Sequence, residues 1–311
     1  MMDRYIVGAG GANFDIHIKT DKPPLPKDSN PGKLHTSAGG VCRNILENLS
    51  RMGGRCVLLS AVGSDSFGDS VLESCRDADI DVSRVCRSDD LPTSVYIDML
   101  DDRGDMFVAA NDMRLIAGIP PEYFEDNASV IGGASAVVID ANLGEEQIAA
   151  ILKAAEGIPV FADPVSAAKC RALKPFTDKL QLIKPNRLEL EALTGMPCGT
   201  DEETEAAAKE LVRLGAKQVV VSLGAGGCLF ADGSTVLRMD LDCDLPVVNA
   251  SGAGDAFTAG LVHGWLNGAD PETLLHYALA CGRIATLSAD TINGCLTEEY
   301  VFRFMDKYPV K

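Results

Sequence analysis

The stretch LPVVNASGAGDAFTAGLVHGWL, residues 245–266, joins a glycine-rich turn to an apolar helical segment. We expect a short strand to end near Asn249 and a tight turn to follow at Gly252 and Gly254, because glycine lets the backbone bend and approach a ligand closely. A helix that begins after such a turn presents unpaired N–H groups and the positive end of its dipole. The stretch therefore predicts an anion-binding helix start within an α/β fold.

Asp255 directly follows this turn, so its carboxylate would lie beside the bound anion. The amides of Gly252, Ala253 and Gly254 could stabilise the charge on a phosphoryl group during its transfer. The helix start favours the ionised carboxylate, and Asp255 would then act as a base through its position more than through its basicity. Taken alone, the stretch fits a simple acidic helix start equally well.

Apolar strand-like runs alternate with amphipathic helical runs over most of the chain. Strands are expected at residues 5–10, 56–62, 137–140, 159–162, 180–183 and 218–223. Helices are expected at residues 44–52, 70–78, 145–155, 187–194 and 202–214. This alternation predicts an α/β fold with a mostly parallel sheet that has helices on both faces.

Two segments, 14–36 and 94–110, alternate apolar and polar residues and break this rhythm. Their pattern predicts half-exposed antiparallel strands. We interpret them as one small β-sheet lid beside a pocket, with edges through which two copies could pair as a homodimer. The expected division is a lid of residues 14–37 and 93–112 on a core of residues 1–13, 38–92 and 113–311.

The composition excludes several classes of protein. With 28 basic and 45 acidic residues, the formal net charge of −17 repels nucleic-acid phosphates, so we expect no nucleic-acid partner. No run of about 18 apolar residues occurs and the N-terminus lacks a secretory pattern, so we expect no membrane association. Ten dispersed cysteines without zinc spacing indicate a reducing, cytoplasmic location.

Two further glycine-rich pieces, residues 8–11 and 224–227, do not fit a dinucleotide site. In the first, Asn13 stands where the last glycine of the motif would be. The second is followed by residues 228–230, which resemble a strand where the motif needs a helix. A P-loop sequence is also absent. These observations argue against a nicotinamide-dependent oxidoreductase.

Side chains suited to a polyol lie in the N-terminal part of the chain. Asn13 and Asp15 follow the first strand, and Gly39 and Gly40 precede Asn44 at the expected start of a helix. A carboxylate and an amide suit hydroxyl groups, because each hydroxyl both donates and accepts. Asn44 could bind a ligand hydroxyl or cap its helix. Taken alone, each residue is more simply interpreted as a polar loop residue.

Asn186 and Glu189 lie three residues apart at a strand-to-helix junction, on one face of the incoming helix. Oxygen ligands of this kind suit Mg²⁺ held through water. The same spacing fits a capping box, and the local sequence favours that interpretation.

Together these pieces resemble the ribokinase-like family of carbohydrate and nucleoside kinases over nearly the whole chain. The most specific pieces are Gly39-Gly40 with Asn44 and the turn at residues 252–255. The resemblance implies a doubly wound α/β fold with a small β-sheet lid. It also implies transfer of a phosphoryl group from ATP, with Mg²⁺, to a hydroxyl group of a small-molecule sugar or nucleoside.

The resemblance further implies roles for individual residues. Asp255 would activate the acceptor hydroxyl, and the amides of residues 252–254 would form the anion hole. The residues implied to contact the substrate are Asn13, Asp15, Gly39, Gly40, Asn44 and Asn111. Those implied to bind ATP, magnesium and phosphate are Asn186, Glu189, Ser222, Gly224 and Gly227.

Within the family, several stretches look most like members that phosphorylate pseudouridine. They are residues 28–33, 39–44, 111–113, 163–170 and 184–189. Ser29, Asn30 and Lys33 are candidates either to contact the uracil edge or to stabilise the lid turn. Kinases of ribose, fructose or a purine nucleoside remain alternatives, as does a sugar sensor without activity, against which the complete glycine turn argues.

One position departs from the family pattern. Many members carry Asp-Thr before the glycine turn, where this chain has Asn249-Ala250. In relatives that aspartate helps to build a monovalent-cation site. The neutral amide of Asn249 leaves potassium activation open.

Overall fold

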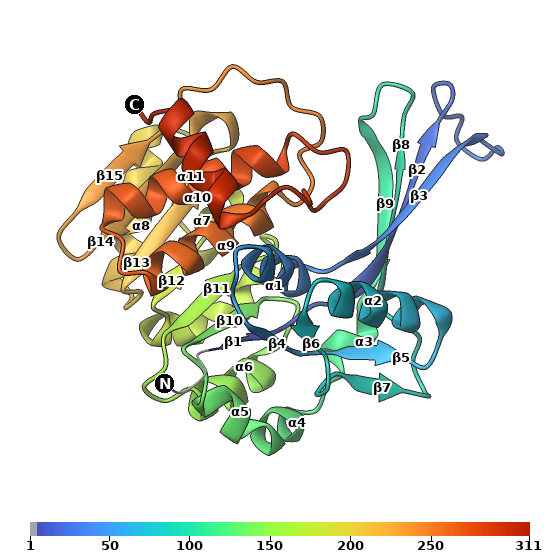
Figure 1. Cartoon of the computed structure of the whole chain (residues 1–311), viewed down its shortest axis with the longest axis horizontal. Helices are drawn as coiled ribbons and strands as arrows, with labels where there is room; N and C mark the ends of the chain where they lie inside the picture. The colour runs from blue at the N-terminus through green and yellow to red at the C-terminus, as the bar shows by residue number, and fades with distance from the viewer. Residues whose placement is uncertain (1–4) are drawn as a thin grey trace.

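The computed structural model describes residues 5–311 and shows a large sheet flanked by helices, with a smaller sheet standing away from it (Figure 1). In the described residues the large sheet has the strand order β15-β14-β13-β12-β11-β10-β1-β4-β6. The bounds are β1 (Ile6–Ala9), β4 (Cys56–Leu59), β6 (Ile80–Asp81), β10 (Ala136–Asp140), β11 (Val160–Asp163), β12 (Leu182–Ile183), β13 (Gln218–Ser222), β14 (Cys228–Asp232) and β15 (Val236–Met239). Only β14 and β15 join it in antiparallel pairing. The predicted mostly parallel sheet is confirmed.

Helices cover both faces of this sheet, because its buried strands present apolar side chains alternately to each face. One face packs against α1 (Val41–Arg51), α2 (Ser66–Asp77), α9 (Ala253–Leu266), α10 (Pro271–Ala285) and α11 (Glu298–Lys307). The other packs against α3 (Arg114–Ala117), α4 (Pro121–Asp126), α5 (Ala128–Gly132), α6 (Glu145–Ala154), α7 (Arg187–Thr194), α8 (Asp201–Arg213) and the 3₁₀ helix η1 (Cys170–Lys179). The predicted two-sided coverage is confirmed.

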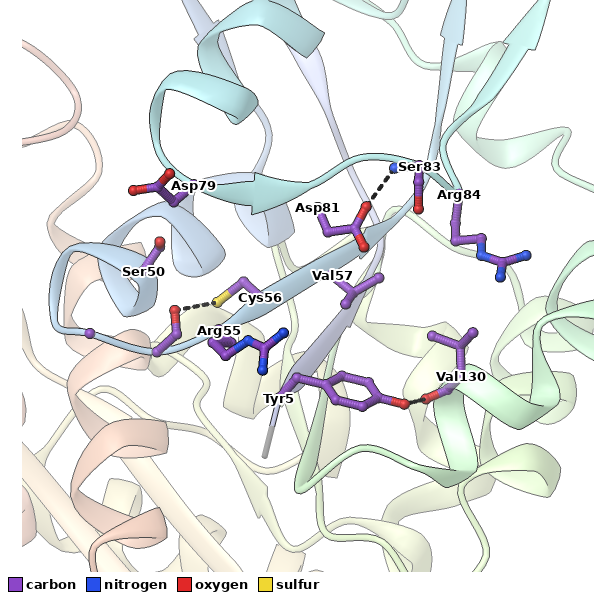
Figure 2. Close-up of a pocket in the computed structure, with 12 residues that line it drawn as sticks. Tyr5, Ser50, Arg55, Cys56, Val57, Asp79, Asp81, Ser83, Arg84 and Val130 are labelled. Atoms are coloured by element: carbon purple, nitrogen blue, oxygen red, sulfur yellow. Dashed lines mark hydrogen bonds between the residues drawn. The ribbon is translucent and has the colours of Figure 1, made fainter. Parts of the chain in front are cut away.

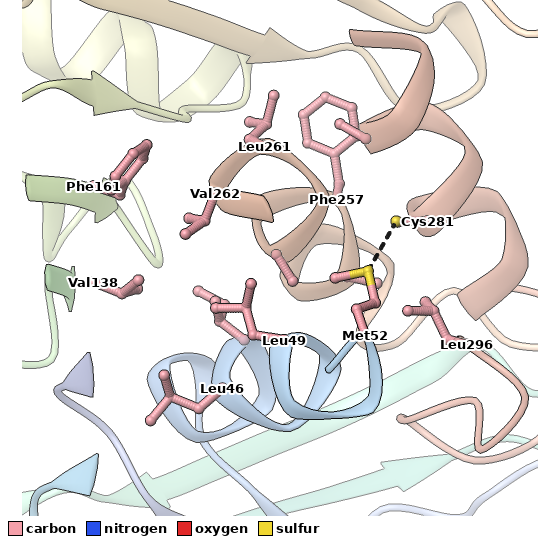
Figure 3. Packing of buried hydrophobic residues seen from close by; sticks show 14 of the residues in the cluster. Leu46, Leu49, Met52, Val138, Phe161, Phe257, Leu261, Val262, Cys281 and Leu296 are labelled. Atoms are coloured by element: carbon pink, nitrogen blue, oxygen red, sulfur yellow. Dashed lines mark hydrogen bonds between the residues drawn. The ribbon is translucent and has the colours of Figure 1, made fainter. Parts of the chain in front are cut away.

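The packing of α1 against α9 is the part of the core that positions the site (Figure 3). Leu49 of α1 and Val262 of α9 are fully buried in one cluster. A Cβ at Gly8 of β1 would lie 2.6 Å from the Leu46 side chain, so glycine allows α1 to pack directly on the strand. The first turns of α1 and α9 consequently lie beside each other.

The smaller sheet has the strand order β3-β2-β8-β9. Its strands are β2 (Asn13–Thr20), β3 (Gly32–Gly39), β8 (Val95–Leu100) and β9 (Met106–Asp112). The pairs β2–β3 and β8–β9 are antiparallel hairpins, but β2 and β8 pair in parallel. The antiparallel prediction is thus wrong for the central pair, since both first arms leave the core in the same direction (Figure 1).

Two predicted elements differ from the observed ones. The short strand expected to end near Asn249 is absent, because the amides of Val248 and Asn249 donate to the carbonyl of Thr286, the C-cap of α10, instead of to a neighbouring strand. The single strand expected at residues 56–62 is divided after Leu59. Its second part, β5 (Ala61–Gly63), pairs with β7 (Cys86–Ser88) in a separate sheet.

Helices α1 and α2 begin several residues earlier than predicted. Helix α2 begins at Ser66, because the Asp65 carboxylate caps it by accepting from the Gly68 amide at 2.8 Å. Helix α1 begins at Val41 with Gly40 as its N-cap, so Asn44 does not cap it.

Among residues 5–311, no helix combines the length and apolar character needed to cross a bilayer. The first residues of the expected core and of the N-terminal pattern, 1–4, lie outside the described residues.

Candidate active site

The glycine-rich turn ends at Gly252, the N-cap of α9, earlier than the sequence predicts, so Gly254 and Asp255 lie in the first turn of the helix. Gly252 has a φ of +74°, and a Cβ there would lie 2.1 Å from the Thr291 carbonyl oxygen, so the turn requires glycine. The Ala253 amide donates to the Ala250 carbonyl at 3.3 Å, and the first bond to the N-cap carbonyl comes from Ala256. The amides of Gly254 and Asp255 precede that bond, where a helix start leaves N–H groups for an anion.

Asp255 contacts the early part of the chain directly. Its Oδ2 accepts a hydrogen bond of 2.8 Å from the Asn44 side-chain amide of α1. Burial raises the pKa of Asp255 to about 7, and the nearby Asp163 charge adds to this while Asn44 and Lys184 oppose it. Burial therefore outweighs the helix-start effect expected from the sequence, and the carboxyl group titrates near neutrality.

A buried ion pair, Lys184–Asp163, lies at the carboxyl ends of β11 and β12. Lys184 Nζ is 3.0 Å from Asp163 Oδ2, and Thr258 of α9 donates to the same oxygen at 3.1 Å. Burial lowers the pKa of Lys184, whereas the negative charges of Asp163, Glu189 and Asp255 raise it. The charges have the larger effect, so the pKa is shifted upward overall. A Cβ at Gly254 would lie 3.4 Å from Lys184 Nζ, which places this cation beside the helix start.

Asp140, at the carboxyl end of β10, fixes the loop that carries the polyol-type residues. Its carboxylate accepts from the backbone amides of Gly11 at 2.9 Å, Cys42 at 2.8 Å and Asn142 at 2.9 Å. Burial raises its pKa despite these bonds. One side chain thus holds the end of β1 and the start of α1 together.

The predicted substrate residues of the N-terminal part lie close together. Asn13 donates to Asp15 Oδ1 at 2.5 Å, and a Cβ at Gly39 would lie 2.1 Å from the Asp15 carboxylate. Gly40 has a φ of +104° and packs on the Gly11 carbonyl. Burial raises the pKa of Asp15 to about 6, although His17 and Asn13 oppose the shift.

Asn111 lies on the same face of the small sheet as Asp15, since each is paired in register with Tyr96 of β8, which lies between them. It is exposed on the edge strand β9. The sheet therefore places Asn111 two strands from Asp15.

The residues predicted to bind ATP also come together. Asn186 and Ser222 form a parallel bridge between the ends of two neighbouring segments. The Asn186 side-chain oxygen accepts from the Glu189 backbone amide at 2.9 Å, and the Asn186 backbone amide donates to Glu189 Oε2 at 2.8 Å. These two bonds form the capping box that the local sequence favours. Gly224, with a φ of +61°, begins the 3₁₀ turn η2 (Gly224–Gly226), and Gly227 packs on the Met239 carbonyl.

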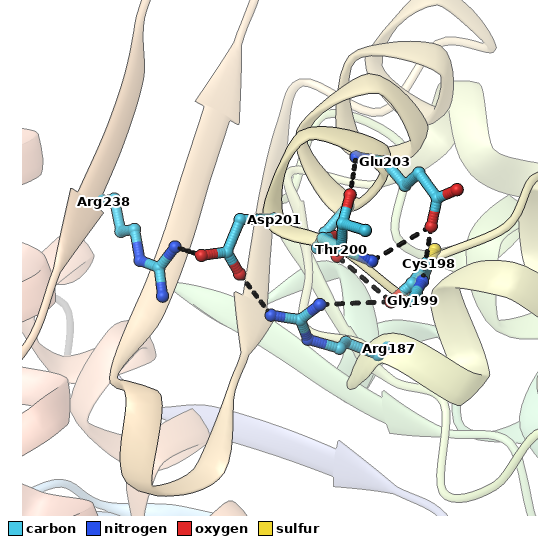
Figure 4. Close-up of polar contacts among 8 residues, drawn as sticks. Arg187, Cys198, Gly199, Thr200, Asp201, Glu203 and Arg238 are labelled. Atoms are coloured by element: carbon cyan, nitrogen blue, oxygen red, sulfur yellow. Dashed lines mark hydrogen bonds and ion pairs between the residues drawn. The ribbon is translucent and has the colours of Figure 1, made fainter.

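An ion-pair network flanks this loop (Figure 4). Arg187 of α7 and Arg238 of β15 both contact the Asp201 carboxylate at the start of α8. A Cβ at Gly226 would lie 3.9 Å from Arg238 Nη2. The network ties three elements to the glycine turn, and the sequence reasoning did not anticipate it.

A separate pocket opens at the other end of the sheet (Figure 2). Its lining residues include Tyr5 and Arg55, which directly precede β1 and β4, and Asp81 of the short strand β6. Ligands of parallel α/β sheets bind outside the carboxyl ends of the strands. The candidate active site is therefore the region around Asp255, beside the carboxyl ends of β1, β10, β11 and β12.

Residues 3–299 match the model of a family described as pfkB family carbohydrate kinase. The chain belongs to the pfkB family. Carbohydrate kinases of the pfkB family are ATP-dependent phosphotransferases with a hydroxyl acceptor, as the sequence resemblance implied.

Similar proteins agree with this placement in the pfkB family. The chain is 36% identical to pseudouridine kinase of Escherichia coli strain K12 over 290 residues, which cover 93% of this chain and 92% of that protein. The structure resembles that of a putative sugar kinase from Clostridium perfringens, with a TM-score of 0.86, 28% identity and coverage of 100% and 98%. It also matches Arabidopsis thaliana ribokinase complexed with ribose and ATP, with a TM-score of 0.88, 23% identity and coverage of 98% and 99%, which bears on the fold alone.

The sequence reasoning missed three charged residues of this candidate site: Asp140, Asp163 and Lys184. Each ends or directly follows a fully buried strand. That position was the available signal, because the ends of neighbouring parallel strands meet at one edge of the sheet.

Proposed function

We propose that this protein transfers a phosphoryl group from ATP to the 5′-hydroxyl of pseudouridine, giving pseudouridine 5′-phosphate and ADP. The proposed catalysis is supported by the contact between Asn44 and Asp255. This contact brings the segment that follows Gly39-Gly40 to the start of α9. The choice of acceptor is supported by the 36% identity to the Escherichia coli pseudouridine kinase over 93% of this chain.

In this mechanism Asp255 takes the proton of the acceptor hydroxyl as the oxygen attacks the terminal phosphorus. A base with a pKa of about 7 is half ionised at neutral pH, where a general base is most effective. The amides of the turn at residues 252–254 and the adjacent Lys184 ammonium stabilise the charge on the transferred group. Because the Ala253 amide already donates to the Ala250 carbonyl, the neighbouring backbone amides contribute more to stabilising this charge.

The chain's own residues would hold the two substrates on either side of Asp255. Asn13, Asp15, Asn44 and the backbone at Gly39 and Gly40 bind the sugar hydroxyls, and Asn111 contacts the same ligand from the lid. Ser222, Gly224 and Gly227 form the wall of the ATP site, because glycine at positions 224 and 227 lets the backbone approach a ligand closely.

When bound, ATP would supply the phosphoryl group and leave as ADP, and Mg²⁺ would neutralise part of the phosphate charge. Among residues 5–311 no group of three or more His, Cys, Asp and Glu side chains gathers into a metal site. The chemistry therefore fits an ion held mainly by phosphate and water oxygens. Asn186 and Glu189 would orient those waters with the oxygen atoms that the capping box leaves available.

Acceptor profiling with ATP and Mg²⁺ tests the proposal. Pseudouridine, uridine, ribose, fructose, adenosine and guanosine would be compared through ADP release and the mass of the product. We expect the highest kcat/KM with pseudouridine. Strong turnover of ribose without turnover of pseudouridine would reject the acceptor and leave the kinase chemistry standing, whereas no ADP release with any acceptor would favour a sensor.

Three accompanying features are proposed on the same basis. The lid of residues 14–37 and 93–112 covers the acceptor and pairs with a second copy in a cytoplasmic homodimer. Potassium has little effect, because Asn249 supplies an amide that donates to the Ala289 carbonyl at 2.9 Å. A titration of turnover against potassium at constant ionic strength checks the last point.

A further inference from the structure

The face of the lid that carries Asp15 has two rows of polar residues, each running across neighbouring strands. Successive residues of a strand point to opposite faces, so Asn13, Asp15 and His17 share one face of β2. The inner row places Ser37, Tyr96 and Asn111 in register with Asp15. The outer row places His35 and Asp98 beside His17.

This face is turned toward the body of the molecule. His35 Nε2 of the outer row is 3.8 Å from Asp290, which belongs to the loop between α10 and α11. The same loop contributes the Thr291 carbonyl that packs on Gly252 at the start of α9. Through this loop the outer row faces the start of α9, which carries the candidate catalytic residue Asp255.

His17 is held in one orientation by Asp98. Its Nδ1 lies 2.9 Å from both carboxylate oxygens of Asp98, and the two side chains are only 19% and 7% exposed. Flanking rings of His35 and Tyr96 lie at centroid distances of 6.2 Å and 6.5 Å. When Nδ1–H donates to a carboxylate, the neutral ring presents its Nε2 lone pair as a hydrogen-bond acceptor.

The position of His17 suits a ligand group beyond the sugar. It lies two residues, about 7 Å, farther along the strand than Asp15. If Asp15 holds the sugar hydroxyls, the outer row lies where the base of a nucleoside would extend. Pseudouridine carries a ring N–H at the place where uridine, which has the same shape, carries a C–H.

We propose that His17, oriented by Asp98, determines acceptor specificity by accepting a hydrogen bond at Nε2 from the N1–H of the pseudouridine base. This inference rests on the proposed function and adds the group that distinguishes pseudouridine from uridine. Lid-turn residues are less suited to the task, because the Asn30 side chain already bonds to the backbone of Leu25 and Asp28.

The test compares kcat/KM for pseudouridine, uridine and ribose in the wild-type protein and in His17→Ala. We expect the wild type to prefer pseudouridine over uridine by about 10-fold or more, the effect of one hydrogen bond to a buried ligand. In His17→Ala this preference should fall to nearly one, while kcat/KM for ribose, which has no base, changes little. An unchanged pseudouridine-to-uridine ratio in His17→Ala would overturn the inference.

Asp98→Asn provides a second and more conservative variant. The amide can donate to Nδ1 and so favour the tautomer in which Nε2 carries the hydrogen. We expect the same loss of preference, and the double variant should lose no more than either single one, because the two residues act as a unit. Additive losses would contradict the orienting role of Asp98.

Thr36→Val is the matched control, because Thr36 lies on the opposite face of the lid, in register with Ile16. Circular dichroism and thermal melts establish that each variant is folded. If the wild type phosphorylates ribose but not pseudouridine, the proposed function fails. If it prefers pseudouridine and His17→Ala retains that preference, only the present inference fails.

Discussion

At the scale of single residues, Asp255 combines two opposing influences. Its place in the first turn of α9 favours the carboxylate, but desolvation of the side chain and the neighbouring Asp163 favour the protonated acid. The second influence is the larger, and it gives the carboxyl group a pKa suited to work at neutral pH. Local sequence showed the first influence, whereas the second depends on residues distant in the chain.

Replacing Asp255 by Asn should separate catalysis from binding and from stability. We expect turnover to fall by about 100-fold or more, because the positioned base is lost, while the acceptor and ATP still bind in calorimetry. Near-normal turnover would refute the role of Asp255 as the base.

The same variant should be more stable than the wild type at high pH. The raised pKa means that the folded protein holds a proton that the unfolded chain releases, so the wild type loses stability as the pH rises toward and through about 7. The stability advantage of Asp255→Asn should therefore be small near pH 4 and reach its full size above pH 7. Thermal melts at both pH values check this, with about 2 to 4 °C expected per kcal/mol.

The pH dependence of the wild-type reaction follows from the same group. Since the base must be ionised, kcat/KM should rise about tenfold per pH unit below pH 7 and level off above it. Asp15, whose pKa is raised to about 6, adds to the decline at lower pH. A profile that stays flat between pH 5.5 and 8 would contradict the assignment.

Lys184→Met should impair both folding and turnover. Loss of the ammonium leaves Asp163 buried without its cation, which costs about 3 to 5 kcal/mol when one partner of a buried pair is removed. It also removes a positive charge beside the anion-binding helix start, so kcat should fall more than KM rises. Lys153→Met is the control, because Lys153 pairs with Glu125 at an exposed surface. Equal effects of the two variants would argue against the role of Lys184.

At the scale of elements, the accuracy of the sequence predictions follows the strength of local signals. Helix α7 was predicted at its observed bounds, because Asn186 caps its start and Gly195, with a φ of +75°, ends it. The strand expected at residues 245–249 was wrong, since a short apolar run does not by itself identify its hydrogen-bond partners. The parallel pairing of β2 with β8 joins segments about eighty residues apart and leaves no local signal.

The residues of the candidate site likewise include some that local sequence predicts and some that it does not. The turn at residues 252–255 and the Gly39-Gly40 pair are local patterns, and both could be predicted. Asp140 could not, because its role is to accept from the amides of Gly11 and Cys42, which are 129 and 98 residues away in sequence. Only the order of strands in the sheet brings these groups together.

At the scale of the whole molecule, the outer face of the lid is an apolar surface suited to pairing. Leu34, Ile97 and Val108 are 65%, 43% and 53% exposed, and alternation places them on the face opposite the polar rows. Ile97→Lys should convert the proposed dimer to a monomer. Light scattering after size exclusion checks this, with Leu188→Lys, at an exposed site on α7, as the control. A monomeric wild-type protein would contradict the proposed homodimer.

The lid is attached to the core at four places, since both arms of each hairpin continue into core segments near residues 13, 39, 94 and 112. Four attachments along one edge define a line about which the sheet can tilt. Such a tilt would bend all four connections together. Because neighbouring strands of the sheet are hydrogen-bonded to each other, a displacement of one strand carries the others with it, and the groups proposed to contact the sugar and its base would engage or release together.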